Sequence, residues 1–246
     1  MAAAPQRVNR PKQPKSPPTS GSNRSFYGLL GLLAVVGGGL LIYLVAKPKA
    51  VSIPANVTVL AADTAGFRGY VMGSDSAKLE ITEYADYQCP VCQDWATVQF
   101  PSVRKELIET GLVRWRYRDF PLDEIHRFAR LAAHAGACGD DQGKFWSMFE
   151  QVYASQPQWA QSSNAAPILR EAAKAAGLDV TKYDACMEST KFAGRIQASR
   201  DEAIKLGVNS TPTFLINGRL HPGRIGSDSL KALVTALTAP AAAPKK

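Results

Sequence analysis

With 246 residues and 46% hydrophobic content, the chain is long enough for one domain with a core of ordinary size and some non-globular length besides. Its formal net charge of +8 comes from the ends, because residues 1–50 hold seven Lys or Arg and no acidic residue, and Lys245 and Lys246 add two more. Residues 51–244 keep 20 basic and 21 acidic residues and are nearly neutral. This balance excludes the basic surface that nucleic-acid-binding domains need, so no nucleic-acid partner is expected.

Residues 26–46 are 21 uncharged residues in a row, FYGLLGLLAVVGGGLLIYLVA. At about 1.5 Å per residue, a helix of this length spans the ~30 Å hydrocarbon core of a bilayer, so we expect one transmembrane anchor. Residues 1–25 hold five cationic residues, whereas only Lys47 and Lys49 follow closely. The positive-inside bias therefore predicts a cytoplasmic basic tail over residues 1–25, with residues 51–246 outside the cell membrane.

The main alternative for this apolar segment is a cleaved signal peptide, and a buried core helix is a weaker one. The apolar region of a signal peptide usually has about 7 to 15 residues, which is shorter than this stretch. No clean small-x-small cleavage site precedes Lys47 either. We therefore favour an uncleaved anchor. An anchor and a signal peptide would both export the domain to a compartment where disulfides persist.

The exported part is expected to hold one domain between two unstructured segments. Residues 47–69 show no sustained hydrophobic period and are interpreted as a spacer. Residues 239–246 are rich in Ala and Pro, which is typical of a disordered tail. Residues 70–238 remain for the folded domain.

The domain is expected to open with a strand, a helix and a second strand. Residues 78–85 are rich in β-branched and aromatic residues and predict a strand, which runs into a helix that starts near Pro90. We expect Pro101 to kink or break that helix and Gly111 to end it. Residues 112–120 alternate apolar and basic residues, as a strand with one exposed face does.

A helical insertion of four or five short helices is expected over residues 123–206, because apolar residues recur there with a helical period. The sequence then predicts a strand, a tight Asn-Gly turn, a short strand and a final helix, at residues 213–216, 217–218, 219–221 and 227–237.

Cys89 and Cys92 form a Cys-x-x-Cys pair at the predicted strand-to-helix junction. The first sulfur then lies at a helix N-terminus, where backbone N–H groups and the helix dipole stabilise a thiolate. We therefore assign Cys89 as the nucleophile. Cys92 lies one turn later, from where it can resolve a mixed disulfide, and it should be the more buried. The pair is not decisive by itself, because Cys-x-x-Cys can also be half of a zinc site.

Proton transfer to or from Cys92 requires an acid or base in an apolar setting. Glu83, six residues before Cys89, is the first candidate, although the strand alone is equally consistent with an exposed carboxylate. Asp86 is closer to the cysteines but is expected in the loop, so it ranks second. The three histidines are interpreted as surface or packing residues: His126, His134 and His221.

Four segments together resemble the DsbA-like branch of the thioredoxin superfamily: GSDSAKLEITEYADYQCPVC, RYRDFPL, DQGKFW and VNSTPTFLING. The resemblance covers about residues 71–237, and the combination of motifs is specific. It implies an α/β thioredoxin-like fold with an inserted helical subdomain, preceded here by the transmembrane helix. It also implies a cis bond between Thr211 and Pro212 that faces the cysteines, and a Thr211 backbone that pairs with an extended substrate segment. The buried acid of the family falls on Glu83.

The chain departs from the family pattern in three places. The residues between the cysteines are Pro90 and Val91, and valine offers the thiolate neither a hydrogen-bond donor nor a charge, which leaves the direction of electron flow open. The N-terminus has the pattern of an anchor in place of a cleaved signal. A further pair, Cys138 and Cys186, lies in the helical insertion.

Cys138 and Cys186 are most simply interpreted as a structural disulfide between helices of the insertion. Such a bridge closes a loop of 49 residues and stabilises the fold by about 4 kcal/mol in the chain-entropy estimate. Two free buried thiols, or a relay pair that passes electrons to the active site, are the alternatives. Relatives with an analogous second bridge favour the structural role.

The leading functional hypothesis is a thiol-disulfide oxidoreductase that acts as a disulfide-forming oxidase on exported proteins with cysteine pairs. The resemblance implies a membrane redox partner, either DsbB-like or a homologue of vitamin K epoxide reductase. Neither a cofactor nor a metal is expected. A reductase or isomerase with the same residues is the nearest alternative. A metal-delivery module with the cysteines as ligands and a non-catalytic anchored scaffold or chaperone are the other two.

Overall fold

The computed structural model describes residues 24–46 and 51–239, and the chain divides into two compact units, Met1–Lys49 and Ala50–Lys246. The first unit contributes helix α1 (Arg24–Ala46), which coincides with the segment expected to form the anchor. Its side chains are described over residues 26–41. Within the described residues, no helix combines the length and the apolar character needed to cross a membrane.

Several expectations fall on residues that the structure does not describe. The basic tail up to residue 23, residues 47–50 of the spacer and the C-terminal tail from residue 240 lie outside the described residues. The membrane anchor over residues 26–46, and the topology that it implies, stay predictions.

Residues 51–69 pack onto the domain, so the expectation of a separate spacer is wrong for this segment. Ile53 is buried in the main hydrophobic core, and Phe67 packs against that core. The short helix α2 (Ala61–Thr64) lies against α10 (Ala193–Lys205). The sequence did not reveal this packing, because the apolar residues that contact the core are isolated in the sequence and follow neither a helical nor a strand period.

A mixed sheet of five strands forms the centre of the second unit, in the order β1-β3-β2-β4-β5. The strands are β1 (Tyr70–Met72), β2 (Leu79–Ala85), β3 (Val113–Asp119), β4 (Thr213–Ile216) and β5 (Arg219–Pro222). Strands β2 and β3 are parallel, whereas the other neighbouring pairs are antiparallel. The last four strands match the predicted ones closely, whereas the short strand β1 was not predicted.

A broken helix connects β2 to β3 and starts at the cysteine pair. It contains α3 (Pro90–Asp94) and α4 (Phe100–Val103), and π-helical turns follow each of them at Trp95–Gln99 and Arg104–Ile108. The break that Pro101 was expected to cause therefore takes the form of wide turns on both sides of the proline, which lacks the N–H for a regular helical hydrogen bond.

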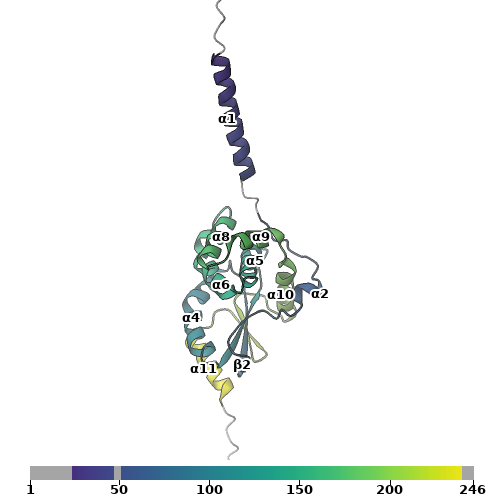
Figure 1. Ribbon diagram of the computed structural model, residues 1–246. Coiled ribbons are helices and arrows are strands. Elements are labelled where there is room, and N and C mark those ends of the chain that lie inside the picture. Colours follow the sequence, from purple (N-terminus) through teal and green to yellow (C-terminus); the bar gives the residue numbers. More distant parts are fainter. Residues whose placement is uncertain (1–23, 47–50, 240–246) are drawn as a thin grey trace, which may run out of the picture. The chain divides into compact units, whose positions relative to one another are not determined.

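The insertion between β3 and β4 has six helices, where four or five were expected: α5 (Ala129–Asp140), α6 (Phe145–Ala154), α7 (Gln156–Trp159), α8 (Ala166–Ala175), α9 (Val180–Ser189) and α10. Figure 1 shows α5, α6, α8 and α9 gathered beyond one end of the sheet, with α4 on one side and α10 on the other. The last helix, α11 (Ser227–Thr238), packs against α4 and β2.

The hydrophobic core that contains the cysteine pair is rich in aromatic side chains. Trp95 and Trp115 are fully buried and stack with ring centroids 5.3 Å apart. The hydroxyl groups of Tyr117 and Tyr153 lie 3.2 Å apart in the same core. These rings leave little room for water, so an ionisable group placed among them titrates in an apolar medium.

Candidate active site

The junction between β2 and α3 positions the two cysteines as the sequence predicts. Cys89 is the N-cap of α3, Pro90 occupies its first turn, and Cys92 follows within the helix. Both cysteines are free thiols. Cys89 is 7% exposed and Cys92 is fully buried, which confirms that Cys92 is the more buried of the two.

Hydrogen-bond donors around the Cys89 sulfur favour its thiolate. The Cys92 thiol makes the largest contribution, and the Thr211 side chain and the backbone at Cys92 and Val91 add smaller ones. Together they lower the pKa of Cys89 to about 5, although burial acts in the opposite direction. The start of the helix therefore stabilises the thiolate through local hydrogen bonds, with no need for a charge or donor from the Val91 side chain.

The pKa of Cys92 is shifted in the opposite direction. Burial raises the pKa of Cys92 well above its ordinary value, and the hydrogen bond to Cys89 and the charges of Cys89 and Glu83 raise it further. At neutral pH the reduced pair is thus one thiolate and one thiol. This difference fits Cys89 as the attacking sulfur and Cys92 as the resolving one.

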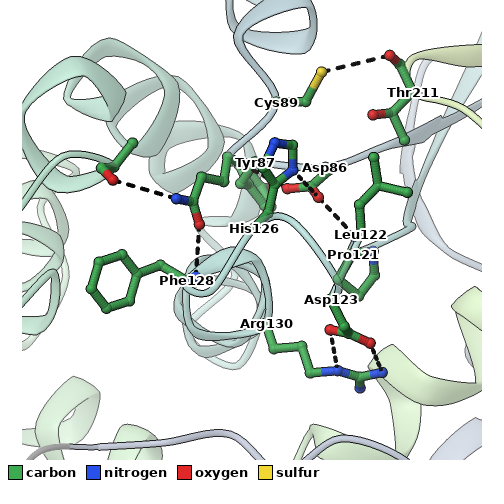
Figure 2. Close-up of polar contacts among 12 residues, drawn as sticks. Asp86, Tyr87, Cys89, Pro121, Leu122, Asp123, His126, Phe128, Arg130 and Thr211 are labelled. Atoms are coloured by element: carbon green, nitrogen blue, oxygen red, sulfur yellow. Dashed lines mark hydrogen bonds and ion pairs between the residues drawn. The ribbon is translucent and has the colours of Figure 1, made fainter.

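The loop before β4 lies directly against Cys89. The Thr211–Pro212 peptide bond is cis, in agreement with the expectation from the resemblance. The Thr211 carbonyl oxygen lies 3.6 Å from Cys89 Sγ (Figure 2). The Thr211 hydroxyl is buried and has no other hydrogen-bond partner within the described part of the chain, so it is available to the Cys89 thiolate, whose pKa it lowers.

Glu83 lies on β2, between Tyr117 of β3 and Phe214 of β4 in the sheet register. It is fully buried, and Trp115 Nε1 donates to its Oε2 at 3.3 Å. Burial raises the pKa of Glu83 to about 8. The exposed carboxylate that the strand pattern left open is therefore excluded. A buried carboxyl group that is protonated near neutral pH, and whose ionised form raises the pKa of Cys92, is suited to proton transfer.

Asp86 and His126 form a second polar group beside Cys89, and Figure 2 shows it. The buried Asp86 carboxylate accepts hydrogen bonds from the backbone N–H groups of Gln88 at 2.7 Å and Leu122 at 2.8 Å. Its Oδ2 lies 2.7 Å from His126 Nδ1. The pKa of His126 is raised, mainly by this hydrogen bond, and the charge of Cys89 adds a smaller contribution.

The sequence reasoning missed His126, which it interpreted as a surface or packing residue. The signal that could have found it is topological. Strands β2 and β3 are parallel, so the loops that follow them leave the sheet at the same end. Asp86 lies in the first of these loops and His126 in the second. Asp86 does lie in a loop, as predicted, but it pairs with a histidine and not with a cysteine side chain.

Cys138 on α5 and Cys186 on α9 form a disulfide with their Cα atoms 5.9 Å apart. Two free thiols are thus excluded as an interpretation of this pair. His134 lies against the bridge, with its Nδ1 3.5 Å from Cys138 Sγ. Burial lowers the pKa of His134 to about 4, so its ring is neutral at neutral pH. The two sulfurs are bonded to each other, so they offer no thiolate to a metal ion in this state.

Comparison with known proteins gives one matching family model, described as Thioredoxin, over residues 67–236. The chain is similar to the Na(+)/H(+) antiporter NhaA 3 of Salinispora tropica, with 32% identity over 214 residues, which are 82% of this chain and 31% of the antiporter. It is also similar to the probable disulfide bond formation protein D of Bacillus anthracis, with 28% identity over 66% of this chain and 75% of that protein.

Among solved structures, oxidised BdbD from Bacillus subtilis is similar with a TM-score of 0.60 and 25% identity, over 68% of this chain and 90% of BdbD. The chain spans less than a third of the length of the antiporter relative, but most of the length of BdbD.

Proposed function

The chain belongs to the thioredoxin family and is DsbA-like, and we propose that it is a disulfide-forming oxidase for exported proteins. The observation that carries the proposal is the hydrogen bonding of Cys89 in the reduced pair. The Cys92 thiol, the Thr211 side chain and the backbone stabilise the thiolate and lower the pKa of Cys89 to about 5. A pair whose reduced form is stabilised in this way readily takes electrons from other dithiols, and this makes it an oxidant.

In the proposed cycle, Cys89 and Cys92 start as a disulfide. A substrate thiolate attacks Cys89 Sγ, the Cys89–Cys92 bond breaks, and the electron pair goes to Cys92 Sγ, which takes a proton from Glu83. A second substrate thiolate then attacks the substrate sulfur of the mixed disulfide, and Cys89 leaves as a thiolate. The substrate has lost two electrons and gained a disulfide, and the reduced cysteine pair holds those electrons.

We place the substrate beside the cis-proline loop. The backbone of Thr211 pairs with an extended substrate segment, a mode of binding that accepts varied sequences because main-chain hydrogen bonds carry it. The 3.6 Å separation between the Thr211 carbonyl oxygen and Cys89 Sγ supports this placement. Val91 is 43% exposed next to Cys89 and offers the substrate an apolar contact.

The proposal includes a location and a partner. Residues 26–46 anchor the protein in the cell membrane by a single span, with the N-terminus in the cytoplasm and the catalytic domain outside. The uncharged stretch supports the anchor. The Cys138–Cys186 disulfide supports an oxidising compartment. A membrane redox partner, DsbB-like or a homologue of vitamin K epoxide reductase, removes the two electrons. Protease added to intact cells tests the topology, because it should digest the domain and spare residues 1–25.

The experiment that tests the function is a redox titration of the full chain in detergent. The protein is equilibrated in glutathione buffers, free thiols are alkylated, and mass spectrometry counts them. We expect a potential above about -150 mV, whereas a value near about -270 mV would identify a reductase. Cys138 and Cys186 are the internal control, because a buried structural bridge should stay unalkylated across the titration.

A further inference from the structure

The pair of Asp86 and His126 takes no part in the cycle above, yet it is held in place beside the reactive sulfur. The parallel strands β2 and β3 bring the loops that carry the two residues to the end of the sheet where α3 begins. The Asp86 side chain has no exposed area, and that of His126 is 15% exposed. Figure 2 shows the imidazole ring between Asp86 and Cys89.

Hydrogen bonds determine how this ring is oriented. Asp86 cannot turn away from it, because its two oxygens also accept the backbone N–H groups of Gln88 and Leu122. His126 Nδ1 faces the carboxylate at 2.7 Å, so Nδ1 carries a hydrogen atom. The second nitrogen, Nε2, is therefore the one that gains or loses a proton.

Other charged groups of the same loop are engaged away from Cys89. Arg130 pairs with Asp123 through two hydrogen bonds, as Figure 2 shows. Arg127 donates to the carbonyl group of Ser162. Asp86 and Cys89 are the groups whose charges act on His126, and both favour its protonated form.

We propose that His126, held by Asp86, is the cationic partner of the Cys89 thiolate and compensates for a Pro90-Val91 dipeptide that carries no charge. The protonated ring stabilises the thiolate and so stabilises the reduced pair. The thiolate stabilises the protonated ring to the same extent, because coupling between two sites is reciprocal. This inference rests on the proposed function only for the place of the thiolate in the cycle.

The proton balance of the reaction follows from this coupling. When a substrate dithiol reduces the pair, two electrons enter the Cys89–Cys92 disulfide, Cys92 takes up one proton, and Cys89 stays a thiolate. His126 Nε2 takes up part of a second proton when the pH lies between its pKa values in the disulfide and thiolate forms. The substrate dithiol releases two protons as it is oxidised, so no other reactant is needed.

The test is an NMR titration of the full chain, labelled at Cε1 of its three histidines, in the disulfide and dithiol forms. A nearby opposite charge shifts a pKa by 1–3 units, and because the ring is partly exposed we expect about 0.5 to 1 unit, with the higher pKa of His126 in the dithiol form. His126→Gln should raise the pKa of Cys89, measured by thiolate absorbance, by the same amount. An equal pKa of His126 in both forms would overturn the proposal, and this comparison needs no variant.

A second variant separates charge from structure. The amide of His126→Asn can still donate to Asp86 but carries no charge, so we expect the same rise in the pKa of Cys89 as in His126→Gln. A wild-type pKa in His126→Asn would mean that the residue only positions Asp86, and the proposal would fail. His221→Gln, on β5, is the matched control and should leave Cys89 unchanged. The NMR titration does not depend on the direction of electron flow. An unchanged pKa of His126 would therefore contradict this proposal alone, whereas a reductase-like potential would contradict the proposed oxidase function alone.

Discussion

Cys89 and Cys92 lie at the start of a helix against a cis-proline loop, whereas Cys138 and Cys186 join α5 to α9 inside the helical insertion. Donors around the first sulfur of the first pair favour a thiolate, and the buried acid Glu83 acts on the second sulfur. The second pair is surrounded by buried apolar and neutral groups. The donors and acids around two cysteines, and not the cysteines themselves, therefore determine whether a pair exchanges electrons or holds helices together.

The histidine beside each pair follows the same division. Asp86 raises the pKa of His126 next to Cys89. Burial lowers the pKa of His134 next to Cys138 to about 4, and its Nε2 accepts a hydrogen bond from the backbone N–H of Phe192. The His126 ring is therefore more readily protonated near the reactive pair, whereas the His134 ring stays neutral beside the disulfide.

Replacing the nucleophile should have the largest effect on thiol-disulfide exchange. In Cys89→Ser, oxidative refolding of a reduced substrate protein should fall to the uncatalysed rate, because Cys92 is fully buried and cannot meet a substrate. The assay is recovery of activity of a reduced ribonuclease in glutathione buffer. The double variant Cys138→Ala/Cys186→Ala is the control and should keep the wild-type rate. An equal loss in both proteins would contradict the division of roles and support an electron relay.

Removing the second bridge should change stability and leave exchange intact. The sulfurs are 48 residues apart in sequence, and the double variant Cys138→Ala/Cys186→Ala should lose about 4 kcal/mol of unfolding free energy in the chain-entropy estimate. Urea denaturation measures this loss. Cys89→Ala/Cys92→Ala, compared with the reduced wild type, should lose much less, because no cross-link is removed.

Glu83→Gln tests the buried acid. We expect exchange at neutral pH to slow by about 100-fold, the lower end of the range for loss of a general acid or base. Stopped-flow measurement of tryptophan fluorescence follows the reaction. Glu80→Gln on the same strand is the matched control, because Glu80 is partly exposed and pairs with Arg116. A rate equal to wild type in Glu83→Gln would exclude Glu83 from proton transfer.

The same residue predicts a pH dependence of stability. Burial raises the folded-state pKa of Glu83 from 4.5 to about 8. The folded state therefore favours the neutral form of Glu83, and this contribution to the free energy of unfolding is fully present below pH 4.5. It is lost as the pH rises from 4.5 to about 8, and above about 8 the free energy does not change further with this group. Urea denaturation of wild type and Glu83→Gln across this range should show the difference between them falling with pH. A difference that stays constant would mean that Glu83 is not buried as described.

Thr211→Val should have the smallest effect, a change in the pKa of Cys89. The substitution removes the unpartnered hydroxyl that is available to the Cys89 thiolate, so the pKa of Cys89 should rise by about 0.5 to 1 unit. The pH dependence of the alkylation rate measures this shift. Thr213→Val is the control, because the Thr213 hydroxyl donates to the Ser210 carbonyl and not to the cysteine. A shift of the same size in both variants would point to the loop backbone as the cause.

Local features of the site were predicted correctly from the chain. The strand over β2, the helix that begins at Pro90 and the position of Cys89 as its N-cap depend on residues close together in sequence. The cis bond before Pro212 followed from the resemblance, and the structure has it. Burial of Glu83 could not be read from the strand pattern, because it depends on β3 and β4 covering both edges of β2.

The reactive motif, the order of the main helices and strands and the cysteine pairs could be predicted from the sequence, because strand period, helix capping and motif spacing act over a few residues. The tertiary structure was needed to show that His126 reaches Asp86 across 40 residues, and it gave the contact between Thr211 and Cys89, 122 residues apart, that the resemblance implied. It was also needed to show that residues 51–69 join the core around Ile53. Such contacts depend on how strands and loops pair in space, and no local pattern in the sequence records that pairing.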